Sequence, residues 1–147
     1  MLQPVRIGHV VLKVRDLDRS LAFYRDILGF TVAGEMSNVM IFLTATGENH
    51  HDLGLLRVGD SAASPVATAV GLYHVAIQLA DWEAVKRAHE VLTERGLLQG
   101  TADHGVSRSL YTADPDGNEI ELFCDAPRAE WEGRVADVMT VKPLRLD

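Results

Sequence analysis

One pattern of residues occurs twice in the chain, and this repeat restricts the fold more than any other feature of the sequence. The stretch GHVVLKVRDLDRSLAFYRDILGF, from Gly8, aligns with YHVAIQLADWEAVKRAHEVLTERGL, from Tyr73. Each copy begins with a short apolar segment that is headed by a histidine, at residues 9–14 and at residues 74–79. Segments of this length and composition are typical of β-strands. The chain is therefore predicted to contain two related modules.

A helix is predicted to follow the first strand of each module. Asp16 and Asp81 stand where a helix begins, and Gly29 and Gly96 stand where it stops. Apolar residues recur at spacings of three and four between them: Leu21, Tyr24 and Leu28 in the first copy, and Val85, Ala88 and Leu92 in the second. These spacings place the apolar side chains on one buried helix face.

Three further strands are predicted in each module after its helix. They cover residues 31–36, 39–45 and 52–58 in the first copy, and residues 97–101, 108–113 and 119–123 in the second. The order of strand, helix and three strands occurs twice. It predicts an α+β fold of two tandem βαβββ modules. Because neither module covers its own sheet, we expect the sheets to combine into one mixed, cup-shaped sheet around a metal site.

These boundaries predict a single domain over residues 1–147. Module 1 spans about residues 5–58, and module 2 spans about residues 72–125. Residues 59–71, which are rich in Ala and Ser, form a linker. Residues 126–147 have no counterpart in the first copy, and we expect a helix and an extended tail there.

Composition restricts the partners of the chain. The 147 residues carry a formal net charge of -7, and Lys and Arg form no run. We therefore expect no binding to nucleic acid or membranes, and a small-molecule ligand instead. Cys124 is the only cysteine, which excludes an internal disulfide and fits a cytoplasmic protein without a signal peptide. Exposed outer strands predict a homo-oligomer such as a homodimer.

Two histidines and one glutamate are the candidate metal ligands. The repeat places His9 and His74 at equivalent positions of the two copies. Strand alternation places Glu121 on the face opposite Ile120 and Leu122. Two imidazoles and one carboxylate form the facial arrangement that binds Fe(II) and leaves coordination positions open. Taken singly, residues of these types are more often hydrogen-bonded or surface residues than metal ligands; the matched positions in the two copies favour ligands.

The strand IGHVVLKVRDLDRSLAFYRDILGF and the closing segment DPDGNEIELF resemble the vicinal oxygen chelate superfamily. This superfamily includes glyoxalase I, extradiol dioxygenases, methylmalonyl-CoA epimerase and antibiotic-resistance proteins. The resemblance covers roughly residues 6–125. It implies the fold described above and implies His9, His74 and Glu121 as metal ligands.

Three further residues resemble those of the type I extradiol catechol dioxygenases. The stretch HHDLGLL places His51 where those enzymes keep a histidine near the O₂ site, and DHGVSRSLY supplies His104 and Tyr111. The resemblance implies that Tyr111 hydrogen-bonds a substrate oxygen and that His104 handles substrate protons. It implies that His51 stabilises an oxygen-derived anion and then donates a proton. Each of the three is also typical of an ordinary loop or strand residue.

The sequence thus predicts an Fe(II)-dependent extradiol dioxygenase that cleaves a catechol-type aromatic diol with O₂. Mn(II), Zn(II) or Ni(II) are alternative metals. A glyoxalase-type metal-dependent lyase, isomerase or thiol transferase remains open, and so does a metal-free protein that binds an antibiotic on the same fold.

Overall fold

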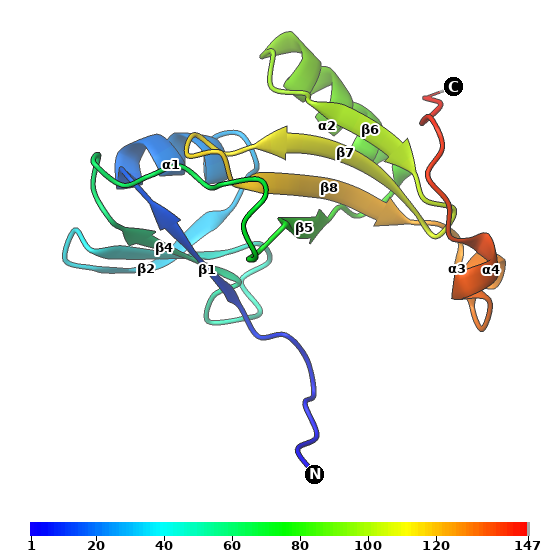
Figure 1. Cartoon of the computed structure of the whole chain (residues 1–147), viewed down its shortest axis with the longest axis horizontal. Coiled ribbons are helices and arrows are strands. Elements are labelled where there is room, and N and C mark those ends of the chain that lie inside the picture. The colour runs from blue at the N-terminus through cyan, green and yellow to red at the C-terminus, as the bar shows by residue number, and fades with distance from the viewer. Residues whose placement is uncertain (147) are drawn as a thin grey trace. The chain divides into compact units, whose positions relative to one another are not determined.

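The first half of the chain forms one four-stranded sheet in the computed structural model, which describes residues 1–146 (Figure 1). Its elements are β1 (Val10–Val14), α1 (Leu17–Tyr24), β2 (Thr31–Met36), β3 (Met40–Thr44) and β4 (Leu53–Arg57). The strand order is β1-β4-β3-β2, with β1 parallel to β4 and the other neighbours antiparallel. Asp147, the last residue of the predicted tail, lies outside the described residues.

The second half repeats this arrangement. Its elements are β5 (His74–Gln78), α2 (Trp82–Glu94), β6 (Gly100–Asp103), β7 (Ser107–Ala113) and β8 (Glu119–Asp125). The strand order is β5-β8-β7-β6, and β5 is parallel to β8. The matching orders confirm the predicted pair of βαβββ modules and the α+β class.

An aspartate starts the main helix of each module. The Asp16 carboxylate accepts a hydrogen bond of 2.8 Å from the backbone N–H of Arg19, and the Asp81 carboxylate accepts one of 2.8 Å from Ala84. Each bond satisfies an N–H group that has no partner inside the helix. The helix starts are therefore encoded locally.

Several predicted boundaries differ from the structure. The helix α1 ends at Tyr24, so Leu28 lies outside the helix on which it was predicted. The first strand begins at Val10, so His9 immediately precedes it, and the strand predicted over residues 97–101 begins only at Gly100. Gly96 adopts a left-handed backbone (φ 66°), and the N–H of Leu97 donates to the carbonyl of Leu92. Residue 97 therefore belongs to the helix end, and the following strand starts later.

Each module packs its helix against its own sheet through fully buried side chains. In the first module these include Val14, Tyr24, Leu43 and Leu55. In the second they include Val85, Leu92, Leu110 and Ile120. Burial of each such side chain stabilises the fold by about 1.5–3 kcal/mol. The packed core therefore keeps the strands that carry the site in fixed positions.

The chain divides into two compact units. Unit 1 comprises residues 1–69 and 114–117, and unit 2 comprises the remaining described residues. The segment 114–117 belongs to unit 1 because the Asp116 carboxylate accepts hydrogen bonds from the backbone and side chain of Arg15. The combined, cup-shaped sheet remains a prediction.

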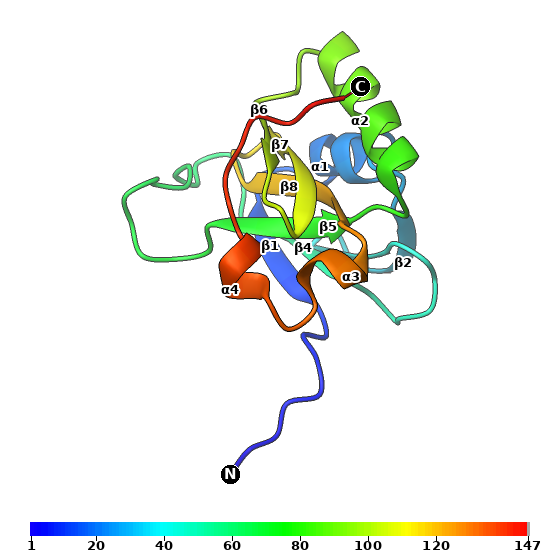
Figure 2. The ribbon, with the colours of Figure 1, turned by 90° about the vertical axis from the view of Figure 1, so that its right-hand side faces the viewer.

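The C-terminal segment contains two short helices, α3 (Arg128–Trp131) and α4 (Val135–Val138), where one was predicted. Beyond them the chain returns to β6, as Figure 2 shows, and an antiparallel bridge joins Asp103 to Lys142. The tail therefore packs on unit 2. Among residues 1–146, no helix is long and apolar enough to cross a membrane.

Candidate functional site

Three neighbouring strands of unit 2 bring polar side chains to one face of their sheet. In the β5–β8 register His74 lies opposite Glu119, and Ala76 lies opposite Glu121. In the β7–β8 register Tyr111 lies opposite Glu121. Residues two apart on a strand share a face, so His74, Glu121 and Tyr111 project together. Ile120 and Leu122 point the other way and are buried.

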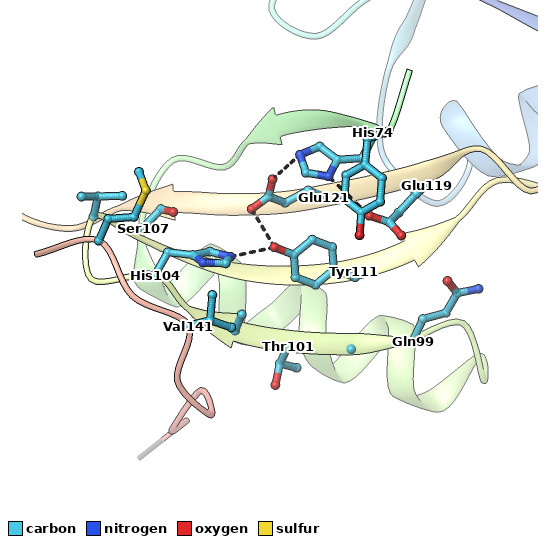
Figure 3. Close-up of a pocket in the computed structure, with 14 residues that line it drawn as sticks. His74, Gln99, Thr101, His104, Ser107, Tyr111, Glu119, Glu121 and Val141 are labelled. Atoms are coloured by element: carbon cyan, nitrogen blue, oxygen red, sulfur yellow. Dashed lines mark hydrogen bonds and ion pairs between the residues drawn. The ribbon is translucent and has the colours of Figure 1, made fainter. Parts of the chain in front are cut away.

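The His74 imidazole contacts two carboxylates (Figure 3). Its Nε2 atom lies 3.1 Å from Oε2 of Glu121, and its Nδ1 atom lies 3.4 Å from Oε1 of Glu119. The Nδ1 atom is shielded from solvent and has no hydrogen-bond partner in the described chain, so the Glu119 contact lacks hydrogen-bond geometry. Glu121 is only 8% exposed, and a buried carboxylate is costly unless it is paired or binds a cation.

Tyr111 connects Glu121 to His104. The Tyr111 hydroxyl lies 2.7 Å from Nε2 of His104 and 3.4 Å from Oε1 of Glu121. Burial and the charge of Glu121 raise the pKa of Tyr111 to about 12. The phenol is therefore neutral at physiological pH. The other nitrogen of His104, Nδ1, lies 3.1 Å from the backbone carbonyl of Thr140.

These residues line a cavity of about 750 Å³ in unit 2. Its polar side is formed by His74, Glu121, Tyr111 and His104. Its apolar side is formed by Ala102, Val106, Met139 and Val141. Figure 3 shows Val141 beside His104, at one end of the polar row. A cavity with a few convergent polar groups and an apolar wall suits a small amphipathic ligand.

Three histidine rings gather in unit 1. The ring centroid of His51 lies 4.3 Å from that of His9 and 4.9 Å from that of Phe42. Nδ1 of His50 lies 2.6 Å from Nδ1 of His51. Desolvation and the neighbouring imidazoles His9 and His50 lower the pKa of His51, so its neutral form is favoured.

The loop that carries His50 and His51 is held by Asp52. Its carboxylate accepts hydrogen bonds from the backbone N–H of Ala45, the Thr44 hydroxyl and the Asn49 amide. Desolvation acts to raise the pKa of Asp52, but these hydrogen bonds outweigh it and lower the pKa. The loop thus has a rigid anchor beside His51.

The structure collects the six residues singled out from the sequence into two sets. His74, Glu121, His104 and Tyr111 form one set in unit 2. His9 and His51 form the other in unit 1. Within either unit taken by itself, the described residues contain no group of three His, Cys, Asp or Glu side chains that could hold a metal. The three-ligand set therefore remains a prediction.

The spacing of two donor atoms in unit 2 agrees with that of two adjacent ligands of one metal ion. Two ligand atoms bound at ~2.1 Å in adjacent positions of an octahedral site lie about 3 Å apart. The observed 3.1 Å between His74 Nε2 and Glu121 Oε2 matches this separation. One imidazole nitrogen and one carboxylate oxygen are also the donor types of a facial Fe(II) site.

Several residues in or next to the cavity were not found from the sequence. Thr140 acts through its backbone carbonyl, which no residue type identifies, and Met139 and Val141 lie in a tail without a counterpart in the first copy. Glu119 alternates with Ile120 as Glu121 does, and this signal could have identified it.

The amino-acid sequence of this chain is similar to those of known proteins. The family model described as Glyoxalase/Bleomycin resistance protein/Dioxygenase superfamily matches residues 6–122. The chain is 40% identical to Catechol-2,3-dioxygenase of Bacillus subtilis (strain 168) over 131 residues, which cover 88% of this chain and 45% of that protein. It is 34% identical to Biphenyl-2,3-diol 1,2-dioxygenase 3 of Rhodococcus globerulus, covering 82% of this chain and 63% of that protein.

The chain spans about half the length of the curated relatives it matches. Among solved structures, a glyoxalase/dioxygenase from Nostoc punctiforme superposes with a TM-score of 0.70 at 24% identity. The match covers 86% of this chain and 97% of that one. This likeness concerns the fold alone.

Proposed function

This chain belongs to the glyoxalase/bleomycin resistance protein/dioxygenase superfamily, and we propose that it is an Fe(II)-dependent extradiol dioxygenase of a catechol-type diol. The observation that carries the proposal is the row Glu121, Tyr111 and His104, which is joined through the Tyr111 hydroxyl and faces the cavity. Cleavage of a diol requires removal of a hydroxyl proton, and a phenol in contact with an imidazole is suited to accept one.

The proposed metal ligands are His9, His74 and Glu121. When bound, Fe(II) supplies coordination positions for both the diol and O₂, together with the redox chemistry. The distance between His74 and Glu121 supports their part in this set. His9 is included because it heads the first copy as His74 heads the second.

The remaining polar residues handle the substrate and its protons. Tyr111 hydrogen-bonds a diol oxygen, and His104 receives the proton that leaves it. His51, whose lowered pKa favours the neutral ring, takes up the second hydroxyl proton of the diol and returns it to the product oxygen as the ring opens. General acid-base assistance of this kind contributes about 10² to 10⁴ in rate.

The relatives support the same reaction class. Proteins named as catechol and biphenyl-diol dioxygenases match at 29–40% identity over most of this chain. One of the relatives, from Rhodococcus jostii (strain RHA1), is named an iron-dependent extradiol dioxygenase at 28% identity. The apolar wall of the cavity suits the aromatic ring of such a diol.

The test is anaerobic reconstitution with Fe(II), followed by oxygen uptake and absorbance measurements on a panel of catechols. We expect one O₂ consumed per diol and a yellow ring-cleavage product. Turnover of a hemithioacetal or thiol substrate without oxygen uptake would instead assign a glyoxalase-type enzyme. Absence of bound metal together with tight binding of an aromatic antibiotic would assign a binding protein.

A further inference from the structure

The position of the proton on the His104 ring follows from its two neighbours. The carbonyl oxygen of Thr140, 3.1 Å from Nδ1, can only accept a hydrogen bond. Nδ1 of His104 must therefore carry a proton. In the neutral ring Nε2 is then a bare acceptor, and it lies 2.7 Å from the Tyr111 hydroxyl. One backbone carbonyl in the C-terminal segment thus selects the tautomer.

This tautomer also determines what Tyr111 offers to a ligand. A phenol has one proton, and a neutral His104 of this tautomer takes it in the 2.7 Å hydrogen bond. The longer distance of 3.4 Å from Tyr111 to Glu121 fits this assignment. The Tyr111 oxygen then presents only lone pairs to the cavity, so it accepts a hydrogen bond from a ligand hydroxyl.

We propose that residues 139–141 form part of the active site and that Thr140 is its positioning residue, holding His104 in the Nδ1–H form so that the Tyr111–His104 pair acts as a base. The catalytic consequence rests on the proposed dioxygenase function, whereas the tautomer does not.

The proton transfer balances as follows. A substrate hydroxyl gives its proton to the Tyr111 oxygen, and the Tyr111 proton passes to Nε2 of His104. The products are a substrate oxyanion and a His104 imidazolium. The imidazolium keeps its Nδ1–H bond to the Thr140 carbonyl, which becomes a stronger, charge-assisted hydrogen bond. Tyr111 ends neutral, as it began.

Backbone pairing holds Thr140 in place. Its N–H donates to the His104 carbonyl at 3.0 Å, and Asp103 and Lys142 exchange two N–H···O bonds of 2.9 Å. Gly105 (φ 75°) packs so closely on Val138 that a Cβ atom at residue 105 would collide with the Val138 carbonyl oxygen. The segment therefore lies close against the loop that carries His104.

The tautomer can be read directly by ¹⁵N NMR of the metal-free protein at pH ~8, where an ordinary histidine is neutral. The His104 signals are identified by their loss in His104→Gln. We expect a protonated-type signal at Nδ1 and an unprotonated-type signal at Nε2. The reverse assignment, or two averaged signals, would overturn the proposal.

Variants then test whether the segment controls this state. Lys142→Pro removes the backbone donor to Asp103, and Lys142→Ala removes the same side chain but keeps the donor. Gly105→Ala drives a methyl group against Val138, whereas Gly96→Ala imposes a similar backbone strain (φ 66°) in open space.

In Lys142→Pro and Gly105→Ala we expect averaged His104 signals, a kcat lowered about 10-fold or more, and a KM changed less than about twofold. The two controls should resemble the wild type in all three quantities, and iron content should be equal throughout. A wild-type tautomer and kcat in both test variants would overturn the proposal. The predicted tautomer in a protein without ring-cleavage activity would refute the dioxygenase function and leave the role of Thr140 in fixing His104 intact.

Discussion

Nε2 of His74 lies 3.1 Å from Oε2 of Glu121, although the two residues are far apart in the sequence. Parallel pairing of β5 with β8 creates this contact, because Ala76 lies opposite Glu121 and His74 shares its face. The contact joins the only two proposed metal ligands that belong to one unit. It also gives the buried Glu121 carboxylate a partner. This contact and four further relationships in the structure can be tested by substitution.

The first prediction concerns iron binding. Glu121→Gln should weaken Fe(II) binding at least 10-fold, because it replaces the carboxylate nearest to His74 Nε2. Glu119→Gln is the matched control, since Glu119 lies on the same face but contacts Nδ1 at the longer distance of 3.4 Å. Anaerobic calorimetry or metal analysis measures both. An equal or larger loss in Glu119→Gln would show that the wrong carboxylate has been assigned.

A second prediction concerns Tyr111 and His104 as a coupled pair. Tyr111→Phe and His104→Gln should each lower kcat about 10²-fold without loss of iron. The double variant should be hardly slower than either single variant, because each removes the same 2.7 Å hydrogen bond. Steady-state kinetics of the wild type, both single variants and the double variant measure this double-mutant cycle, with the catechol that the wild type turns over fastest. Multiplicative effects would mean that the two residues act independently.

A third prediction concerns His51. His51→Ala should slow turnover while iron content stays at the wild-type level, because this ring is proposed to move protons and to bind no metal. His89→Ala, a replacement on α2, controls for the loss of an imidazole. Metal analysis and kcat, measured on the same preparation, distinguish a role in proton transfer from a role as a metal ligand. Loss of iron in His51→Ala would instead assign this residue as a ligand.

A fourth prediction concerns the stability of unit 1. The Asp116 carboxylate, 5% exposed, pairs with Arg15 at 2.9 Å and with Arg19 at 2.7 Å. Asp116→Ala should lower the free energy of unfolding by about 2 kcal/mol, because it leaves two guanidinium groups and the backbone N–H of Arg15 without this partner. Asp26→Ala, in an exposed pair with Arg25, should change it little. Urea unfolding compares the two variants. Similar unfolding midpoints would show that the buried Asp116 pair stabilises the fold no more than the exposed Asp26 pair.

The last prediction concerns alkaline pH. Tyr24 is fully buried and donates a 2.9 Å hydrogen bond to Asp114, and burial followed by the charge of Asp114 raises the pKa of Tyr24. The unfolded chain therefore loses this proton first, at a pH of about 10. The stabilisation is fully present below that pH and is lost as the pH rises toward the pKa of the folded state.

Above pH ~10 the wild type should accordingly lose about 1.4 kcal/mol more per pH unit than Tyr24→Phe. Between pH 7 and 9 the difference between the two proteins should be constant, which serves as the internal control. Urea unfolding at a series of pH values measures it. Parallel curves up to pH 11 would contradict the buried, neutral state of Tyr24.

Much of the local structure could be predicted from the sequence. The aspartates that begin α1 and α2, the apolar spacing of the helices and the alternation in β8 are all local signals, and the structure has these elements in the predicted order. The repeat then predicts that both modules share one strand order, as they do. Hydrogen bonding and hydrophobic periodicity act over a few residues, so neighbouring residue types reveal them.

The sequence by itself determined which residue types could act: His74 at the head of a strand, Glu121 between apolar neighbours, and Tyr111 beside them. Only the tertiary structure decided that Thr140 completes their row, because its contribution is a carbonyl group that every residue possesses. Backbone groups acquire a function through their position, and here pairing of the tail with Asp103 and His104 sets that position.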